Sequence, residues 1–325
     1  MRSPLSYLSR TILINRISLS PPRHLPLPLS RTITITTMST TPTPVPNGTQ
    51  PKKPQIPKGK TELKILMLHG YTQSGALFSS KTKALSKLLL KAVSPAPYNL
   101  HPTLIYPTAP LRLRPSDIPG YQLSDEGGNE EEEGDNWAWF RKHEATGTYR
   151  GFSDGMRAIA TAIADAGGVD GVCGFSQGGA MAALVASALE EPHREPPSPP
   201  SHSAPDLDLE LGSDPETSWL PLLRAANNNR PLKFCVIYSG FYAPVEELQW
   251  LYTPSIATPT LHFLGSLDTV VEESRSQGLV DRCVDPTVVV HPGGHYVPVA
   301  KDWVLVLVGW LRKRYEKPSA EKEVL

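Results

Sequence analysis

The feature that most constrains the fold is a series of short apolar runs that alternate with helical patterns. Continuous apolar runs are typical of strands buried on both faces of a parallel sheet. Between them, Phe152, Met156, Ile159 and Ile163 recur at the spacing of one helix face. This alternation predicts the α/β class, with a mostly parallel central sheet covered by helices on both faces. The runs lie at residues 64–68, 103–106, 171–174, 233–238, 260–264 and 287–290, and further helices are expected at 180–189 and 299–314.

Proline and charge mark the ends of this domain and two interruptions within it. Of the 34 prolines, eleven lie in residues 1–60 and a second group follows residue 191. A glycine-containing acidic run (DEGGNEEEEGD) also reads as a solvated loop. We therefore predict one domain over 62–315, disordered insertions near 125–135 and 190–216, and disordered ends at 1–61 and 316–325.

The charge distribution and the cysteines exclude several classes of protein. Residues 1–61 carry nine basic and no acidic side chains, so the remainder of this neutral chain is acidic. An acidic body argues against nucleic acid as a partner. No apolar run approaches the 18 or so residues of a membrane-spanning helix. The three cysteines lack the spacing of a zinc site and are odd in number, which indicates neither a metal site nor a disulfide framework.

The first 37 residues favour one of two interpretations. They contain five arginines, many Ser and Thr residues and no acid, a composition typical of a mitochondrial transit peptide. Alternatively, translation begins at Met38. We expect the protein in the cytoplasm, with the nucleus as a second location. If residues 1–37 are translated, we expect it in mitochondria.

A serine in a strand–turn–helix context is the candidate nucleophile. Gly174-Phe-Ser176-Gln-Gly178 follows an apolar run and precedes an Ala-rich helix, as a nucleophile elbow does. The same pattern occurs at Gly151-Phe-Ser153-Asp-Gly155, but the residues before it are polar and prone to turns. We interpret Ser153 as the N-cap of a helix and Ser176 as the nucleophile.

An acid and a histidine follow the serine in the order this arrangement requires. Asp268 comes after the apolar run 260–264, and His295 after the run 287–290 and two glycines. Each would lie on a loop beyond a later strand, where it can orient or serve as the base. Two alternatives compete: Asp268 capping a helix that begins near Val271, and His291 in place of His295. We favour the triad Ser176, Asp268 and His295.

The loop after the first strand would complete the site. Its backbone N–H at Tyr71, together with that of Gln177, would bind the oxyanion of an acyl-transfer reaction. His69 stands in the same loop without a second His or carboxylate at ligand spacing, so we interpret it as structural. The pattern calls for no metal and no cofactor.

Four segments together resemble the FSH-type serine hydrolases, a group of α/β-hydrolases that includes the ovarian-cancer-associated esterase and fungal relatives. The elbow segment alone also occurs in acyl-protein thioesterases. The resemblance covers about residues 62–314, apart from the two insertions. The segments are Leu68-His-Gly-Tyr-Thr-Gln-Ser74, Asn136-Trp-Ala-Trp-Phe140, Gly174-Phe-Ser-Gln-Gly-Gly179 and His291-Pro-Gly-Gly-His-Tyr-Val-Pro298.

The resemblance implies a hydrolase of carboxylic esters or acyl thioesters that uses the proposed triad. Trp137, Trp139 and Phe140 either line an acyl pocket or anchor their loop to the body. The alternatives are a carboxylesterase like the acyl-protein thioesterases, a peptidase, or a catalytically silent protein of the same fold that binds a small molecule. The expected partner is a small acyl ester or thioester, and we take a monomer as the default.

Overall fold

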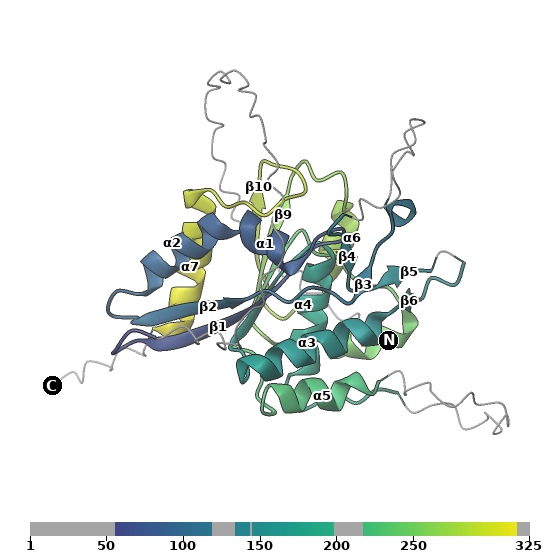
Figure 1. The fold of residues 1–325 in the computed structure, drawn as a ribbon, viewed down its shortest axis with the longest axis horizontal. Helices are drawn as coiled ribbons and strands as arrows, with labels where there is room; N and C mark the ends of the chain where they lie inside the picture. Colours follow the sequence, from purple (N-terminus) through teal and green to yellow (C-terminus); the bar gives the residue numbers. More distant parts are fainter. Residues whose placement is uncertain (1–55, 119–133, 144, 198–216, 317–325) are drawn as a thin grey trace, which may run out of the picture.

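The computed structural model describes residues 56–118, 134–143, 145–197 and 217–316 (Figure 1). Most of the predicted disordered segments, namely residues 1–55, 125–133, 198–216 and 317–325, lie outside these ranges.

The centre of the fold is a six-stranded sheet in the order β10-β9-β8-β7-β1-β2. Every neighbouring pair in it is parallel. This arrangement confirms the predicted α/β class. The strands are β1 (Thr61–Leu68), β2 (Leu100–Ile105), β7 (Gly171–Phe175), β8 (Phe234–Tyr238), β9 (Thr260–Gly265) and β10 (Thr287–His291).

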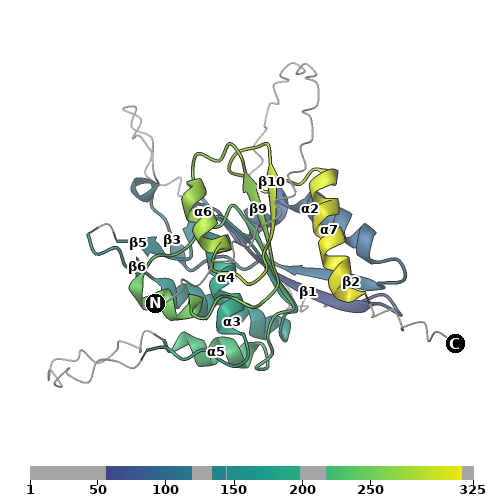
Figure 2. The same cartoon turned by 180° about the vertical axis from the view of Figure 1, so that it is seen from behind.

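Helices cover the sheet on both faces (Figures 1 and 2). On one face α2 packs beside α7, and on the other lie α3, α4 and α5. The helices are α1 (Gly75–Lys81), α2 (Lys83–Val93), α3 (Phe152–Ala166), α4 (Gln177–Ala188), α5 (Trp219–Ala226), α6 (Glu273–Val280) and α7 (Lys301–Tyr315), with 3-10 turns η1 (Pro115–Asp117) and η2 (Glu246–Tyr252).

The two cores follow from side chains that alternate along the strands. In β1, Ile65 and Met67 point into the core beneath α2 and α7, whereas Leu66 and Leu68 point into the core beneath α3 and α4. Helix α4 is buried along its whole length. Its Ala-rich sequence lets it lie directly against the sheet, which fixes the position of its N-terminal residue.

The order in which strands are added to the sheet changes direction at β1, so β2 and β7 lie on opposite sides of it. From β1 the chain moves outward to β2, and it then returns to add β7, β8, β9 and β10 on the other side. Ligands of open parallel sheets bind beyond the carboxyl ends of the strands at such a switch point. The loop that follows Leu68 and the turn at Ser176 both lie there.

Two short hairpins lie beside this edge. One pairs β3 (Leu111–Arg112) with β4 (Trp137–Ala138), and the other pairs β5 (Arg141–Lys142) with β6 (Tyr149–Arg150). A single bridge between Gln73 and Trp137 connects the first hairpin to the loop after β1.

The interpretation of Ser153 as an N-cap was wrong. Helix α3 begins at Phe152, so Ser153 is its second residue, and the cap position belongs to Gly151. The chain enters α3 from β6 with Gly151 at φ 75°, in the left-handed region that favours glycine. The rest of the prediction is unaffected, because Ser153 lies at the start of a helix that no buried strand precedes.

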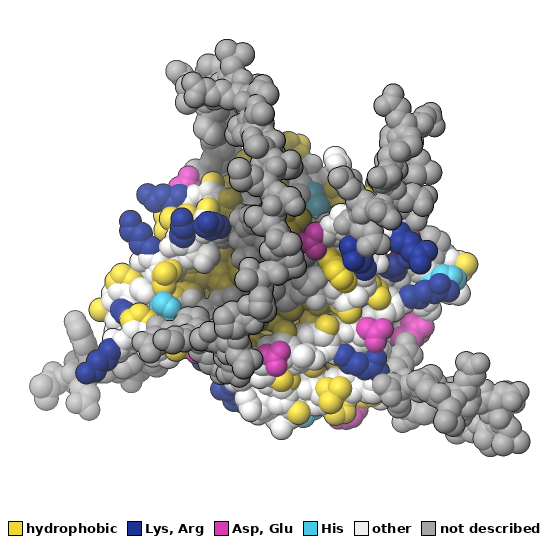
Figure 3. Space-filling view, viewed as in Figure 1, with side chains coloured by type: hydrophobic (Ala, Val, Ile, Leu, Met, Phe, Trp, Pro, Cys, Tyr) yellow, Lys and Arg dark blue, Asp and Glu magenta, His cyan; other side chains and the backbone are white. Residues whose placement is uncertain are grey.

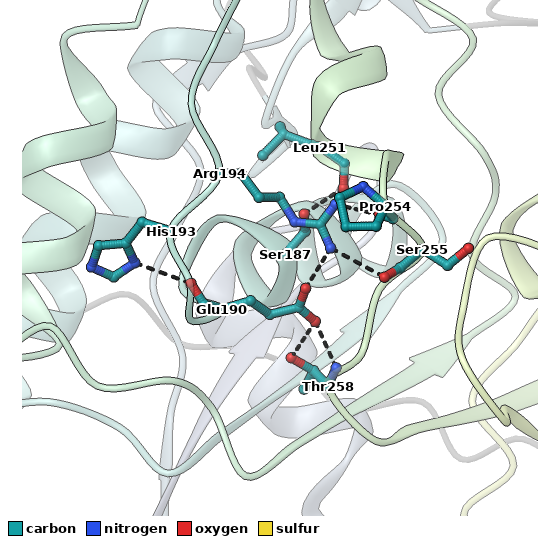
Figure 4. Close-up of polar contacts among 8 residues, drawn as sticks. All are labelled: Ser187, Glu190, His193, Arg194, Leu251, Pro254, Ser255 and Thr258. Carbon is teal, nitrogen blue, oxygen red and sulfur yellow. Dashed lines mark hydrogen bonds and ion pairs between the residues drawn. The ribbon is translucent and has the colours of Figure 1, made fainter.

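The predicted insertion at 190–216 begins with ordered residues. Glu190 and Arg194 are both buried and form an ion pair (Figure 4). The other carboxylate oxygen of Glu190 accepts hydrogen bonds from the backbone N–H (2.6 Å) and Oγ1 (2.8 Å) of Thr258. Arg194 donates to the carbonyl oxygen of Pro254. Composition alone predicted disorder here because the segment is rich in proline, whereas a buried ion pair holds its first residues to the loop before β9.

The outer side of α2 is basic. Lys83, Lys87 and Lys91 are exposed at intervals of four residues along it. Figure 3 shows basic side chains gathered over this helix, at the upper left of the view. These lysines contrast with the acidic charge of the chain beyond residue 61.

Candidate active site

Ser176 occupies a sharp turn between β7 and α4. Its backbone has φ 54° and ψ −117°, a conformation that serine rarely adopts. Its N–H donates to the carbonyl oxygen of Tyr238 (2.8 Å), which ties the turn to β8. A Cβ on Gly178 would lie 2.2 Å from the carbonyl oxygen of Leu68, so only glycine allows α4 to approach β1 this closely. The turn presents the Ser176 side chain at the carboxyl edge of the sheet.

Asp268 and His295 lie together on the loops after β9 and β10. Nδ1 of His295 and Oδ2 of Asp268 are 2.8 Å apart, and both side chains are largely buried. The loops contact each other through their backbones, where the N–H of Leu267 donates to the carbonyl oxygen of Gly293 (3.0 Å). Two residues 27 positions apart in the chain thus form the pair that a catalytic histidine requires.

Asp268 also caps the turn that leads to α6. Its Oδ1 accepts hydrogen bonds from the backbone N–H of Val270 and Val271, each 2.9 Å. The two interpretations of Asp268 are therefore compatible, because each uses a different oxygen. Burial acts to raise the pKa of Asp268, but hydrogen bonds from Val271 and His295 outweigh it and lower the pKa below its usual value. Asp268 is ionised at neutral pH.

The predicted base lies close to the predicted nucleophile. The ring of His295 packs against the ring of Phe175, the residue before Ser176, with centroids 4.9 Å apart. Within the described part of the chain, no hydrogen bond joins Ser176 Oγ to His295 Nε2. Such bonds are often long in enzymes without substrate and shorten in the substrate complex.

His291 is placed differently from His295. It is buried at the end of β10, and its ring contacts those of Tyr296 and Trp303. Neither ring nitrogen has a partner among the described residues. Burial lowers the pKa of His291. The structure thus brings His295, and not His291, to Asp268.

The two amides predicted to bind an oxyanion lie at the switch point. Gln177 is the first residue of α4, so its N–H has no acceptor within the helix. In the part of the chain that the structure describes, neither this N–H nor that of Tyr71 donates to a protein acceptor. The next amide along, that of Thr72, is already used, because it donates to the carbonyl oxygen of Trp137 (3.0 Å).

His69 holds the loop that carries Tyr71. Its Nε2 accepts a hydrogen bond from the N–H of Ala109 (3.0 Å), so its Nδ1 bears the proton and donates to the carbonyl oxygen of Gly70 (2.8 Å). Burial lowers the pKa of His69 to about 4, while the Gly70 bond and the charge of Asp135 act in the opposite direction. The ring is therefore neutral, and both nitrogens serve the backbone, as a structural histidine requires.

The side chain of Gln177 joins the nucleophile turn to the aromatic segment. Its Oε1 accepts from the N–H of Trp139 and its Nε2 donates to the carbonyl oxygen of Phe140, each at 2.8 Å. The indole N–H of Trp139 in turn donates to the carbonyl oxygen of His69 (2.9 Å). The loop after β1 and the turn at Ser176 are thus connected through Trp139.

The three aromatic residues of this segment differ in exposure. Trp139 is fully buried, and Phe140 is nearly so and stacks on Tyr149 with centroids 4.1 Å apart. Both anchor the segment to the body, which was one of the two interpretations. Trp137 is half-buried, and its Nε1 donates to Asp135 (2.8 Å). Of the three, only Trp137 has the exposure to contact a substrate.

Sequence reasoning missed three parts of this arrangement. It treated Gln177 only as a backbone donor and gave Asp135, which bonds to the Ser74 hydroxyl, no role beyond a solvated loop. It also missed the indole donor of Trp139. A partial signal was present for Gln177, because an amide side chain directly after the nucleophile enters a buried helix and must find partners there.

No group of three or more His, Cys, Asp or Glu residues that could hold a metal ion occurs in the described ranges. The three cysteines are buried and free, and burial raises the pKa of each thiol. No helix among residues 56–118, 134–143, 145–197 and 217–316 is long and apolar enough to cross a membrane.

Comparison with known proteins gives consistent matches. Residues 59–306 match the family described as Serine hydrolase (FSH1). The budding-yeast protein named Family of serine hydrolases 2 is 31% identical over 255 residues, which cover 77% of this chain and 97% of that protein. The zebrafish protein named Esterase OVCA2 is 30% identical, covering 73% of this chain and 91% of that one.

A fission-yeast protein named Dihydrofolate reductase is 32% identical over 241 residues. The match covers 73% of this chain but only 44% of that protein, so the chain spans less than half the length of this relative.

Proposed function

The chain belongs to the FSH1 family of serine hydrolases, and from this premise we propose that it hydrolyses a carboxylic ester or an acyl thioester through Ser176, His295 and Asp268. The observation that carries the proposal is the 2.8 Å contact between Asp268 and His295, which is formed beside the Ser176 turn at the switch point of the sheet. Relatives named esterases support the choice of ester bonds.

In the first half of the reaction, Ser176 Oγ attacks the substrate carbonyl while His295 Nε2 takes its proton. Asp268 accepts a hydrogen bond from the Nδ1–H of His295 and keeps its negative charge, which fixes the tautomer and stabilises the imidazolium that forms. His295 then returns the proton to the leaving alcohol or thiol. An acyl group remains bonded to Ser176 Oγ.

The negative charge on the carbonyl oxygen is held by the N–H groups of Tyr71 and Gln177, which have no protein acceptor among the described residues. In the second half of the reaction, water attacks the acyl-enzyme, with His295 as the base. The acid leaves and Ser176 regains its proton. Removing one such donor typically costs about 100- to 1,000-fold in rate, so a shift of either amide should slow the reaction markedly.

A fluorophosphonate probe followed by mass spectrometry tests this proposal. We expect an adduct on the peptide that contains Ser176, and none on Ser176→Ala or His295→Ala protein. Ser153→Ala is the matched control, because it alters the same motif elsewhere in the chain, and it should label normally. Absence of an adduct on folded wild-type protein, or an adduct on Ser153, would contradict the proposal.

A panel of esters and thioesters with the same acyl group then measures the preference between the two leaving groups. An amide of the same acyl group tests the peptidase alternative. Ser176→Ala protein should lose nearly all turnover while unfolding at the same temperature as the wild type. Near-normal turnover by this variant would refute the assignment of the nucleophile.

A further inference from the structure

We propose that Arg275 forms an anion-binding subsite at the rim of the active site, so that the preferred ester or thioester carries a negatively charged group away from the reacting carbonyl. This inference rests on the proposed hydrolysis at Ser176. It adds a substrate class to that activity.

Arg275 lies in the first turn of α6, the helix that follows Asp268. Asp268 Oδ1 holds the turn through the N–H of Val270 and Val271, and α6 begins two residues later at Glu273. The carbonyl oxygen of Arg275 accepts from the N–H of Tyr242 (3.0 Å). The start of α6 is thus fixed both to the catalytic loop and to the loop after β8.

The loop after β8 places Arg275 near the nucleophile. Its Gly240 packs against Gly179, whose N–H donates to the carbonyl oxygen of Ser176 (2.9 Å). The next residue, Phe241, presents its ring to the Arg275 guanidinium, with Cζ 4.2 Å from the ring centroid. A phenyl ring on the loop that contacts the first turn of α4 thus supports the cation.

Tyr149 of β6, which contacts the aromatic segment, is also near Arg275. Tyr149 stacks on Phe140, whose carbonyl oxygen accepts from the Gln177 side chain. Burial raises the pKa of Tyr149, and the positive charge of Arg275 opposes this shift, so the guanidinium and the phenol are close enough to interact. Arg275 is therefore near two elements, each of which is linked to the residues after Ser176. Figures 1 and 2 show α6 near the carboxyl ends of the central strands, where these loops lie.

Apart from the Phe241 ring, the charge of Arg275 has no partner in the described part of the chain. Its side chain is exposed and makes no ion pair or hydrogen bond there, although Glu272 and Glu273 are neighbours in sequence. A cation in the first turn of a helix is also unfavourable, because the amino end carries partial positive charge. The contact with the Phe241 ring holds the guanidinium in place but leaves its N–H groups without an acceptor among the described residues.

Arg282, just beyond the carboxyl end of α6, is an arginine whose guanidinium is bound by protein groups. Its Nη1 donates to the carbonyl oxygen of Gly278 (2.7 Å), and its Cζ lies 3.4 Å from the ring centroid of Tyr242. The carboxyl end of a helix favours a cation. Arg282 is thus satisfied by Gly278 and Tyr242, whereas the guanidinium N–H groups of Arg275 have no acceptor among the described residues and match a carboxylate or a phosphate.

The test measures kcat/KM on two matched pairs of substrates. One pair is a monoester of a dicarboxylic acid and the same ester with its free acid converted to a primary amide. The other is a thioester of phosphopantetheine and the same thioester of pantetheine. The first pair places the charge on the acyl group and the second places it on the leaving group, so the two arms tell which part of the substrate reaches Arg275.

We expect the wild type to favour the charged member of at least one pair. In Arg275→Gln this ratio should fall about 10- to 100-fold, as the loss of a hydrogen bond to a charged group predicts. Arg275→Lys should restore part of it, and added salt should reduce it in the wild type. Arg282→Gln is the control, and it should leave the ratio unchanged.

Equal turnover of both members of each pair by the wild type would overturn the inference. So would an Arg275→Gln variant that retains the ratio. Failure of the proposed function has a different signature, since neither member of either pair would then be cleaved and the fluorophosphonate would not label Ser176.

Discussion

Replacing Gln177 by methionine should destabilise the fold, because the side chain of Gln177 makes two buried hydrogen bonds. Methionine has a similar length and no hydrogen-bonding group of comparable strength. The N–H of Trp139 and the carbonyl oxygen of Phe140 would both lose their partner at sites that are almost fully buried. An unsatisfied buried group costs about 1–3 kcal/mol, so the free energy of unfolding should fall by about 2–6 kcal/mol.

Urea and thermal unfolding measure this loss. For a domain of this size about 1 kcal/mol corresponds to a shift of about 2–4 °C in Tm, so we expect Tm to fall by about 4–24 °C. Gln277→Met is the matched control, since Gln277 is exposed and bonds only to Asp281. It should change the free energy of unfolding by no more than about 0.5 kcal/mol. If Gln177→Met unfolded at the same urea concentration as the wild type, the reasoning on buried partners would be refuted.

Two further predictions concern charge. The pKa of His69 in the folded protein is about 4, below its unfolded value of 6.5, so the unfolded chain takes up the proton first. Stability should therefore fall as the pH drops from about 6.5 to about 4, by about 3 kcal/mol for this residue, and His69→Gln should flatten the pH profile of urea unfolding. An unchanged profile would contradict the shift. Glu190→Gln leaves Arg194 buried without a carboxylate and should cost about 3–5 kcal/mol by denaturant unfolding. The comparison is the more exposed ion pair of Asp154 and Arg157 in α3, where Asp154→Asn should cost less than about 1 kcal/mol. Equal costs for the two substitutions would refute the argument from burial.

Much of the fold could be predicted from the sequence, because strands buried on both faces leave a simple signal. Five of the six runs lie within a strand of the sheet or overlap it almost completely, and the elbow at Ser176 follows the run at 171–174. The edge strand β2 was the least well predicted. It begins at Leu100, three residues before the predicted run, and its residues after Leu100 are only half-buried. His101 and Pro102 interrupt the apolar run near the start of the strand, so the pattern identifies only its second half.

The site was predictable as far as chain order and local context determine it. Asp268 and His295 come together because β9 and β10 are neighbours in the sheet, which the order of the motifs implied. The side-chain bonds of Gln177 and the buried pair of Glu190 and Arg194 could not be predicted. Both depend on which distant backbone groups the fold leaves without partners, and no local pattern encodes that.

The ordered residues around the buried pair of Glu190 and Arg194 have a consequence for where new chain ends can be introduced. Arg224 of α5 donates hydrogen bonds to the carbonyl oxygens of Arg194 and Ala188, so the residues on the two sides of 198–216 are held to each other directly. Trp219 packs edge-on against Phe152 of α3, with centroids 5.8 Å apart. Covalent continuity between residues 197 and 217 is therefore not what keeps α5 in place. A circular permutant with its new ends between residues 197 and 217, or a protein split there into two chains, would retain the contacts that join α4, α5 and the sheet.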